Sequence, residues 1–483
     1  MKLSEIVKDV KLEELKGGET EITGISYDSR AVKPGDLFVA IKGFEFDGHK
    51  YIPAAIEAGA SAILCQEKPD ADIAYALSSD SRLALALAGR EFYGDPASEM
   101  TIVGVTGTNG KTTTTYLLKH LLESKLDAKV GLIGTNGNMI GSEFLHSERT
   151  TPESLELQRL FREMADSGCT HVVMEVSSHS LCLDRVAGIH FDVGIFTNLT
   201  QDHLDFHGTM EEYAKAKAKL FRMCTDGCFN ADDAWCETMT KDATCKIHSY
   251  AIDAHNTELY ADDVKLSPSG IEFYAVSGNE RVKTKLCIPG KFSVYNALCV
   301  MSAGLALGIS LSDCADAVGS AKGVKGRMEL VPTDGDYTIV IDYSHTPDAL
   351  ENALKALCIN DEGRLVALFG CGGDRDRTKR PIMGAVAAKY ADFVIVTSDN
   401  PRTEEPQSII DEIVVGMSGS DTPYTVICDR PDAIRWAIDN HRPHDVILLA
   451  GKGHEDYQVV GHEKHHMDER EIVAEHIEKR KNR

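Results

Sequence analysis

The stretch from Gly104 to Thr113, GVTGTNGKTT, has the residue types of a loop that holds phosphate groups. It follows the β-branched run Thr101-Ile102-Val103 and leads into a segment with helical apolar spacing. Backbone N–H groups in such a loop face phosphate oxygens, and the helix dipole favours negative charge there. Lys111 is placed to reach the terminal phosphates, and the Thr112 hydroxyl to bind Mg²⁺. A plain glycine turn is the alternative, because Val105 stands where the usual pattern has its first glycine.

Two further strand ends carry candidate ligands. The apolar run His171 to Glu175 ends in an acid, where phosphate-loop proteins place the carboxylate that holds magnesium directly or through water. A buried Glu175 without a partner would be costly, which favours such a role. The apolar run 193–197 is followed by several polar residues that include His203. Taken singly, His203 is better explained as a structural histidine than as a ligand.

Lys217 lies on the apolar side of a predicted helix. Thr209 to Glu212 has the form of a capping box, so we expect a helix to begin near Met210. The helical period places Lys217 in the apolar stripe, whereas Lys215 and Lys219 point towards water. Two interpretations remain: a lysine that snorkels at the edge of the stripe, or one whose pKa is depressed so that its neutral amine can be modified.

The last third of the chain alternates strand and helix, which predicts a mostly parallel sheet with helices on both faces. We expect strands at 337–341, 365–369, 393–397, 424–427 and 446–449. Ligands bind beyond the carboxyl ends of such strands. Four of the five exits are rich in polar residues: 342–345, 372–375, 399–402 and 451–455. This pattern indicates a pocket for a small polar ligand.

The length of 483 residues exceeds what one hydrophobic core normally supports. We predict an α/β protein of three domains: residues 1–98, residues 99–330 with the phosphate loop of an ATPase-type domain, and residues 331–483 with a Rossmann-like, mostly parallel sheet. Between 230 and 290 the pattern is short strands and turns, and Ser267-Pro268-Ser269-Gly270 is a hairpin signal.

Composition limits the class of partner and the compartment. The net charge of -24 argues against nucleic-acid binding, and no apolar run approaches the roughly 20 residues that span a bilayer. The first fifteen residues are charged throughout, lack a signal-peptide core and read as an amphipathic helix. We therefore expect a cytoplasmic protein.

The 13 cysteines mostly have apolar neighbours, which suits reduced thiols. Cys224, Cys228, Cys236 and Cys245 lie close together, but their spacing is unlike the paired short spacings of zinc sites. We do not expect a structural metal there.

Several separated motifs together resemble the Mur ligases, the ATP-dependent amide-forming enzymes of peptidoglycan precursor synthesis. Besides the phosphate loop they are MEVSSHSL at 174–181, NLTQDHLDFHG at 198–208, the Tyr-x-x-x-Lys of 213–217, GRME at 326–329 and DYSHTPDAL at 342–350. The resemblance covers essentially the whole chain, and the irregular glycine spacing is normal in that family.

Within the family, the chain is most similar to the members that add the third residue of the peptide. Asp28-Ser29-Arg30, with PGDLFVA after it, and Thr150-Thr151-Pro152 are similar to their nucleotide-sugar segments. GCGGDRDRTKRPIMG at 370–384 and DNPR at 399–402 resemble their amino-acid pocket, and DNPR indicates meso-diaminopimelate as the amino acid added. Diaminopimelate differs from lysine by a second carboxylate, which a planar guanidinium such as Arg402 can bind with two parallel hydrogen bonds.

The resemblance implies phosphoryl transfer from ATP to the γ-carboxylate of UDP-N-acetylmuramoyl-L-alanyl-D-glutamate, followed by attack of the diaminopimelate amine on the acyl phosphate. It also implies that Lys217 is carbamylated, which gives a buried lysine a carboxylate-like function. One departure is Ser293, where relatives commonly have Asn, and it affects the adenine contact.

The resemblance assigns four groups of residues. The catalytic residues are Lys111, Glu175, His203 and Lys217, and the magnesium ligands are Thr112, Glu175, His203 and Lys217. ATP is contacted by Gly107, Thr108, Asn109, Gly110, Lys111, Thr112, Thr113, Asn296, Arg327 and Asp342. The UDP-sugar peptide is contacted by Ser29, Thr150, Thr151, Ser177, Arg185 and His345, and the amino acid by Arg375, Asp399, Asn400, Arg402, Gly451 and Glu455, with Glu455 pairing with the distal ammonium.

Competing interpretations use the same loop for other purposes. A lysine-adding ligase or a folylpolyglutamate synthetase-like enzyme would share the chemistry, and the DNPR motif speaks against both. A GTP-dependent switch would need an Asn-Lys-x-Asp motif, which is absent, and a nucleic-acid motor would need a basic surface. A catalytically silent binding module conflicts with the presence of Lys111, Glu175 and Lys217. We expect a monomer with no nucleic-acid partner and no membrane insertion.

Overall fold

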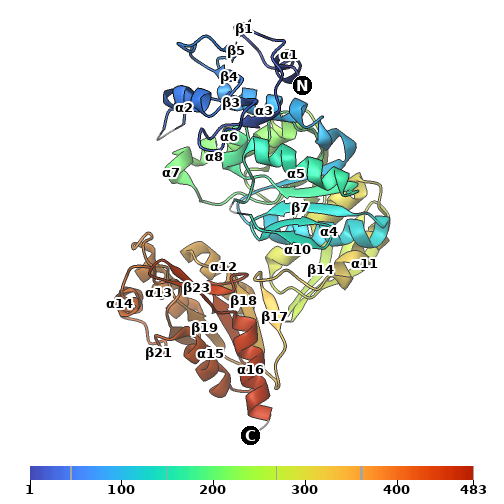
Figure 1. Ribbon diagram of the computed structural model, residues 1–483. Helices are drawn as coiled ribbons and strands as arrows, with labels where there is room; N and C mark the ends of the chain where they lie inside the picture. Colours follow the sequence, from blue (N-terminus) through green and yellow to red (C-terminus); the bar gives the residue numbers. More distant parts are fainter. Residues whose placement is uncertain (44–45, 148, 268, 359–362, 482–483) are drawn as a thin grey trace. The chain divides into compact units, whose positions relative to one another are not determined.

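The computed structural model describes residues 1–43, 46–147, 149–267, 269–358 and 363–481 (Figure 1). The chain divides into two compact units, 1–250 with 302–309, and 251–301 with 310–483. The α/β class is confirmed, with several mostly parallel sheets. The domain limits at 98/99 and 330/331 stay predictions.

The first sheet, near the amino terminus, has the strand order β1-β5-β4-β3-β2. Strands β3 and β4 are buried throughout, because apolar clusters cover both faces of the sheet. Helix α3 begins where the Asp80 side chain accepts hydrogen bonds from the N–H groups of Arg82 and Leu83. The bounds are α1 Leu3–Ile6, β1 Glu14–Lys16, β2 Gly24–Ser26, β3 Asp36–Val39, α2 Ile52–Glu57, β4 Ala62–Cys65, β5 Ala74–Leu77 and α3 Ser81–Phe92.

The expected amphipathic helix over the first fifteen residues is wrong. Helix α1 covers only Leu3–Ile6, and Glu14–Lys16 forms edge strand β1, which pairs antiparallel with β5. Pairing satisfies the backbone of 14–16 and overrides a helical pattern that was only four turns long.

The second sheet of the first unit runs β13-β12-β11-β6-β10-β7-β8-β9. Strand β6 lies between β10 and β11, parallel to both, with Val105 opposite Glu175 and Ile195. The carboxyl ends of these three strands therefore meet at one edge. The bounds are β6 Thr101–Thr106, α4 Lys111–Leu126, β7 Val130–Gly134, β8 Gly137–Ile140, β9 Glu143–Leu145, α5 Ser154–Asp166, β10 His171–Glu175, α6 Ser178–Cys182, β11 Phe191–Phe196, α7 Leu204–His207, α8 Met210–Ala218, β12 Cys224–Asn230, α9 Cys236–Thr240 and β13 Lys246–Ala251.

The second unit begins with three antiparallel strands, β14 (Leu259–Ser267), β15 (Gly270–Ser277) and β16 (Glu280–Leu286). The hairpin predicted at 267–270 is confirmed by the pairing of Ser267 with Gly270, although Pro268 itself lies outside the described residues. Helices α10 (Lys291–Ala306) and α11 (Leu311–Ser320) follow.

The last sheet runs β17-β18-β22-β19-β20-β21, and all neighbours except β17 and β18 are parallel. Helices α15 and α16 contribute the buried residues that cover one face. The five predicted strands are confirmed to within one residue at each end, whereas β17 and the hairpin of β23 and β24 were not predicted. The bounds are β17 Glu329–Val331, β18 Thr338–Asp342, α12 Pro347–Leu357, β19 Leu365–Phe369, α13 Lys379–Tyr390, β20 Phe393–Val396, α14 Pro406–Val415, β21 Tyr424–Val426, α15 Arg430–Asp439, β22 Val446–Ala450, β23 Tyr457–Val460, β24 Glu463–His466 and α16 Glu469–Lys481.

The described helices are each too short or too polar to cross a membrane. The thirteen cysteines are free thiols. In the described part of the chain, no three His, Cys, Asp or Glu side chains are grouped so as to hold a metal ion, and this includes the cysteines between 224 and 245.

Candidate active site

The phosphate loop joins β6 to α4 as the sequence predicts. Val105 is fully buried inside β6, so the loop begins at Gly107 and needs no glycine at position 105. Gly107 has a φ of 147°, and a Cβ there would lie 1.9 Å from Thr197 Oγ1. Gly110, with a φ of 86°, is the N-cap of α4. Lys111 Nζ turns back over the loop and donates hydrogen bonds of 2.8 Å to the carbonyls of Gly107 and Thr108.

The segment after β11 holds the loop in place. Asn198 accepts from Thr108 N through its carbonyl at 2.8 Å and from Asn109 N through Oδ1 at 3.0 Å. Thr197 Oγ1 donates to the Asn109 carbonyl at 2.7 Å. The loop conformation is therefore fixed by backbone and side-chain groups of the segment that follows β11, which is the preorganisation that phosphate binding needs.

Glu175 is 1% exposed at the end of β10, and its carboxylate is fully hydrogen-bonded. Its Oε1 accepts from Thr112 Oγ1 at 2.9 Å and from Thr135 N at 3.0 Å, and its Oε2 accepts from Thr135 Oγ1 at 3.1 Å. Thr112 and Glu175 thus present adjacent hard oxygen atoms, which is the donor set that suits Mg²⁺, an ion that takes one or two protein ligands and otherwise keeps water.

Lys217 is 1% exposed, so the interpretation as a snorkelling lysine is wrong. Helix α8 begins at Met210 with Thr209 Oγ1 accepting from Glu212 N at 3.2 Å, as predicted. Lys217 Nζ donates to the Gly107 carbonyl at 2.8 Å and lies 4.6 Å from the centre of the Tyr213 ring. Burial, reinforced by the charge of Lys111, holds the pKa of Lys217 well below its ordinary value. The lysine amine therefore reaches the phosphate loop from a helix more than a hundred residues away.

His203 lies at the amino end of α7 among aromatic and imidazole rings. Its backbone φ is 52°, and its ring centre lies 4.9 Å from that of His179 and 6.2 Å from that of Tyr213. Nearby, His207 Nε2 is 2.9 Å from Ser178 Oγ, and burial lowers the pKa of His207 to about 4. Tyr213 is the shared neighbour of Lys217 and His203, and its hydroxyl lies 3.2 Å from Thr108 Oγ1.

Four of the residues assigned to the UDP-sugar peptide come together beside Glu175. Thr151 Oγ1 donates to the Glu175 carbonyl at 2.8 Å and accepts from Ser177 N at 3.2 Å. Arg185 Nη1 donates to the Thr151 carbonyl at 3.3 Å. Thr150 Oγ1 is 2.9 Å from Thr135 Oγ1, which also bonds Glu175.

Ser29 is half-buried in the loop after β2. Within the described residues it forms no hydrogen bond with the four residues of that group, Thr150, Thr151, Ser177 and Arg185. Its neighbour Arg30 is paired with Asp28 at 2.7 Å on the surface.

The second unit carries the remaining residues assigned to ATP, together with His345. Asn296 is 4% exposed on α10. Asp342 accepts from Met328 N at 2.8 Å, and the Arg327 guanidinium lies 5.1 Å from the ring of Tyr343. His345 Nδ1 lies 2.9 Å from the Tyr343 carbonyl.

Ser293, where relatives commonly have Asn, directs its hydroxyl to the Pro289 carbonyl at 2.8 Å. That hydroxyl therefore stabilises the start of α10.

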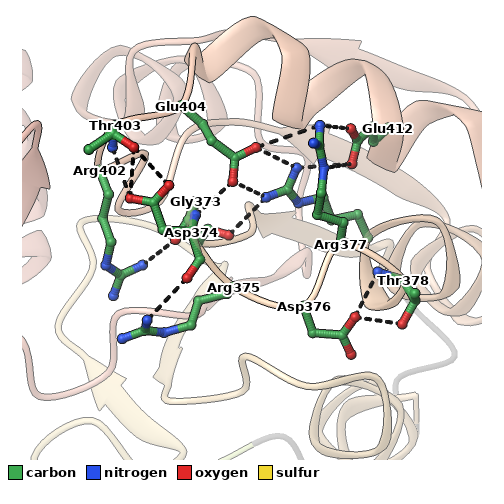
Figure 2. A network of polar contacts seen from close by, with 12 residues as sticks. Gly373, Asp374, Arg375, Asp376, Arg377, Thr378, Arg402, Thr403, Glu404 and Glu412 are labelled. Atoms are coloured by element: carbon green, nitrogen blue, oxygen red, sulfur yellow. Dashed lines mark hydrogen bonds and ion pairs between the residues drawn. The ribbon is translucent and has the colours of Figure 1, made fainter.

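The residues predicted to bind the amino acid lie at strand exits of the second unit. Arg402 adopts a φ of 52° and is fixed on both sides, because its N–H donates to the Val459 carbonyl at 3.1 Å and its own carbonyl accepts from Gly461 N at 2.8 Å. The hairpin of β23 and β24 thus holds the turn after β20. The guanidinium donates through Nη1 to the Gly373 carbonyl at 2.8 Å (Figure 2). Arg375 is exposed and donates to the Asp374 carbonyl at 3.1 Å.

An ionic network connects the two loops that carry Gly373 and Arg402 (Figure 2). Arg380 is fully buried and contacts Glu404 at 2.8 Å and Glu412 at 2.9 Å. Glu404 Oε1 also accepts from Asp374 N at 2.6 Å, and Thr403 Oγ1 donates to Asp374 Oδ1 at 2.8 Å. Arg380 lowers the pKa of Glu404 to about 2, so the carboxylate stays charged and holds both loops.

Four of the residues assigned to the amino acid lie close together: Asp399, Asn400, Gly451 and Glu455. Asn400 Nδ2 donates to Glu455 Oε2 at 3.1 Å, and Asp399 Oδ1 accepts from Asn400 N at 2.6 Å. A Cβ on Gly451 would lie 2.6 Å from Asp399 Oδ2, so glycine is required. Lys452 Nζ, which the sequence analysis did not assign, donates to both Asn400 and Glu455.

Several functional neighbours were missed from the sequence. Asn198, Tyr213, Arg380 and Lys452 each lie inside a motif that was noted, but the sequence pattern does not show that Arg380 and Lys452 are buried against carboxylates. Thr135 belongs to no motif, and only strand pairing brings it to Glu175.

Comparison with known protein families gives three matches along the chain. Residues 21–91 match "Mur ligase family, catalytic domain", residues 105–304 match "Mur ligase middle domain", and residues 326–453 match "Mur ligase, glutamate ligase domain".

Two similar curated proteins span the whole chain. One from Caldanaerobacter subterraneus subsp. tengcongensis is 47% identical over 481 residues, with 98% of each chain covered. One from Clostridium botulinum is 46% identical over 485 residues, with 99% of each covered. Both are named UDP-N-acetylmuramoyl-L-alanyl-D-glutamate--2,6-diaminopimelate ligase.

Solved structures agree with the fold. A structure of a ligase with that name has a TM-score of 0.76 and 33% identity, and covers 100% of this chain and 99% of its own. MurF from Acinetobacter baumannii has a TM-score of 0.63 at 19% identity, with 99% and 98% covered, which is similarity of fold alone.

Proposed function

The chain belongs to the Mur ligase family, and we propose that it is the ATP-dependent ligase that adds meso-2,6-diaminopimelate to UDP-N-acetylmuramoyl-L-alanyl-D-glutamate. The observation that supports the choice of amino acid is the turn 399–402, in which the Arg402 guanidinium donates to the Gly373 carbonyl and the Asn400 amide donates to the Glu455 carboxylate. The similar proteins that carry this name match over 98% or more of this chain.

The first half-reaction transfers the γ-phosphoryl group of ATP to the substrate carboxylate. The N–H groups of the phosphate loop, fixed by Asn198, bind the phosphates, and Lys111 exchanges its two carbonyl contacts for phosphate oxygens. Thr112 and Glu175 would hold a magnesium ion, which would supply charge neutralisation there. No side-chain nucleophile is required, because such transfer depends on position and charge.

Lys217 has the properties of a lysine that reacts with carbon dioxide. Burial lowers its pKa, which favours the neutral amine, and its Nζ lies against the phosphate loop. We propose that it is carbamylated and, with His203, completes a second magnesium site. Carbamylation replaces a buried cation with a carboxylate-like group that a metal ion can pair with.

In the second half-reaction the diaminopimelate amine attacks the acyl phosphate. Arg402 binds the distal carboxylate and Glu455 the distal ammonium, which leaves the other amine free to react. Ser177 and Arg185 hold the muramoyl peptide, and Ser29, Thr150, Thr151 and His345 complete the contacts with the UDP-sugar peptide. Asn296, Arg327 and Asp342 contact ATP.

The proposed organisation is that residues 1–98 bind the UDP-sugar, 99–330 bind ATP and 331–483 bind the amino acid. The enzyme acts as a monomer in the cytoplasm, where nucleotide-linked precursors and ATP are available.

The test is ADP formation measured with the muramoyl dipeptide while the amino acid is varied. We expect ADP release with meso-diaminopimelate and little with L-lysine. Equal rates with both amino acids would reject the assigned acceptor, and no ADP release with either would reject the function.

A further inference from the structure

Lys452 is a buried cation within the amino-acid pocket that no step of the proposed reaction uses. It follows β22, and its side chain is 0% exposed. Its Nζ donates to Glu455 Oε2 at 2.6 Å and to Asn400 Oδ1 at 2.8 Å, and it lies 5.2 Å from the centre of the Tyr457 ring. A buried ammonium is retained only where its partners offset a desolvation cost of several kcal/mol.

These contacts fix the direction of two pocket groups. Asn400 Oδ1 also accepts from Val459 N at 2.8 Å, so the amide oxygen is fully used and its Nδ2 must point to Glu455 Oε2. Glu455 Oε2 therefore receives two donors, from Lys452 and Asn400. Within the described part of the chain no hydrogen bond reaches Glu455 Oε1, which is left for the ligand.

Charged side chains of both signs belong to the pocket. Burial raises the pKa of Tyr457, the charges of Glu455 and Asp456 raise it further, and the charge of Arg402 opposes them. The Lys452 ammonium lies 5.2 Å from the centre of the Tyr457 ring and forms an ion pair with Glu455. The nearby Asp456 is exposed, where solvent screens its charge.

The pair beneath the pocket adds no net charge. Arg430 and Glu469 are both fully buried and 2.8 Å apart. Within the pocket, Lys452 offsets the carboxylate of Glu455, which would otherwise attract a lone ammonium, and this suits an amino-acid end that carries one carboxylate and one ammonium. A lysine end, with an ammonium alone, would bring an uncompensated positive charge.

We propose that Lys452 is a specificity-determining residue: its ammonium cancels one pocket carboxylate and so makes the site select a zwitterionic end over a cationic one. This inference rests on the proposed function, and it adds repulsion of lysine to the attraction that Arg402 provides for the second carboxylate. Selectivity then has two parts, one from each cation of the pocket.

The experiment compares kcat/KM for meso-diaminopimelate and for L-lysine in the full-length protein and its Lys452→Met variant. The control is Lys464→Met, because Lys464 lies 4.2 Å from the same Tyr457 ring but on an exposed strand. Removing the buried ammonium leaves the pocket with one excess negative charge. We expect the ratio of the two kcat/KM values to fall about tenfold, equal to about 1.4 kcal/mol, through KM rather than kcat and with an unchanged KM for ATP. The control keeps the wild-type ratio.

A second variant keeps the proposal testable if Lys452→Met does not fold. Glu455→Gln changes a half-buried group at the pocket surface and leaves one excess positive charge. We expect it to raise the selectivity against lysine further while both activities fall. A Lys452→Met ratio that stays at the wild-type value, or a Glu455→Gln ratio that moves towards lysine, would overturn the inference. Wild-type protein that releases no ADP with diaminopimelate would instead reject the proposed function.

Discussion

The phosphate site and the amino-acid pocket are built from different interactions. In the phosphate site the two lysines, Lys111 and Lys217, donate to backbone carbonyls of the loop, and the loop is fixed by neutral hydrogen bonds that Asn198 accepts. In the pocket, ion pairs hold several of the supporting groups, as with Arg380 and Glu404 or Lys452 and Glu455. The first arrangement can exchange its contacts for phosphate and metal, whereas the second holds a fixed pattern of charge. We therefore expect the chemistry to depend on the exchangeable site and the selectivity on the fixed one.

The largest effect is expected from Lys111→Ala. This change removes the cation that would reach the transferred phosphoryl group, and kcat/KM should fall about a thousandfold, in line with the loss of a key charge in phosphoryl transfer. ADP release with both substrates present is the measurement. An unchanged thermal unfolding midpoint would show that the fold is intact, whereas residual activity above a tenth of wild type would contradict the assigned role.

Lys217→Ala should reduce activity about a hundredfold or more, because it removes the proposed metal-binding carbamate. Addition of a small carboxylic acid such as acetate should restore part of the activity. Lys215→Ala is the matched control, since Lys215 lies on the same helix but faces water. Full activity of the Lys217 variant would contradict the assigned role of this lysine. Loss of activity that acetate does not restore, together with a lowered unfolding midpoint, would contradict it as well.

Arg402→Ala should raise KM for diaminopimelate about thirtyfold, since it deletes a charge-assisted pair of hydrogen bonds, while KM for ATP stays within about twofold. Steady-state kinetics with each substrate varied in turn measures both. If KM rises equally for the two substrates, Arg402 does not act on the amino acid alone and the assigned separation of the two sites is wrong.

The ion pairs near the pocket should differ in how much each contributes to the free energy of unfolding of the protein. Arg380→Met leaves Glu404 and Glu412 without their buried partner and should cost about 3 kcal/mol in the free energy of unfolding at pH 7. Arg377→Met removes an exposed partner of the same Glu412 and should cost less than about 1 kcal/mol.

The cost of Arg380→Met should depend on pH. Arg380 lowers the pKa of Glu404 to about 2, so the stabilisation is complete above the ordinary glutamate range and is lost as the pH falls towards 2. Chemical denaturation at pH 7 and near pH 3 should show the difference between variant and wild type shrinking on the acid side. An equal cost at both pH values would mean that packing, not charge, holds the two loops.

The sequence predicted those features that depend on local pattern. The strand, loop and helix around Lys111 follow from β-branched residues and glycines, and helical periodicity alone placed Lys217 on a buried face. The five strands of the last sheet were found because each is a continuous apolar run.

Features that depend on tertiary pairing could not be predicted in the same way. The hairpin of β23 and β24 is short and polar, yet it holds Arg402 and Asn400 through backbone contacts. Lys452 and Arg380 sit among charged residues that look solvated in the sequence, and their burial follows only from the packing of distant loops. The amino-terminal segment looked helical because its alternative, pairing of Glu14–Lys16 with β5, is a long-range contact.

The most direct test of the account is the mass of the product formed when meso-diaminopimelate and L-lysine compete at equal concentration with ATP, Mg²⁺ and the muramoyl dipeptide. The account predicts that nearly all of the product carries diaminopimelate, heavier than the lysine product by one carboxyl group, and that Lys452→Met increases the lysine-containing fraction. Predominant incorporation of lysine by the wild-type protein would contradict it.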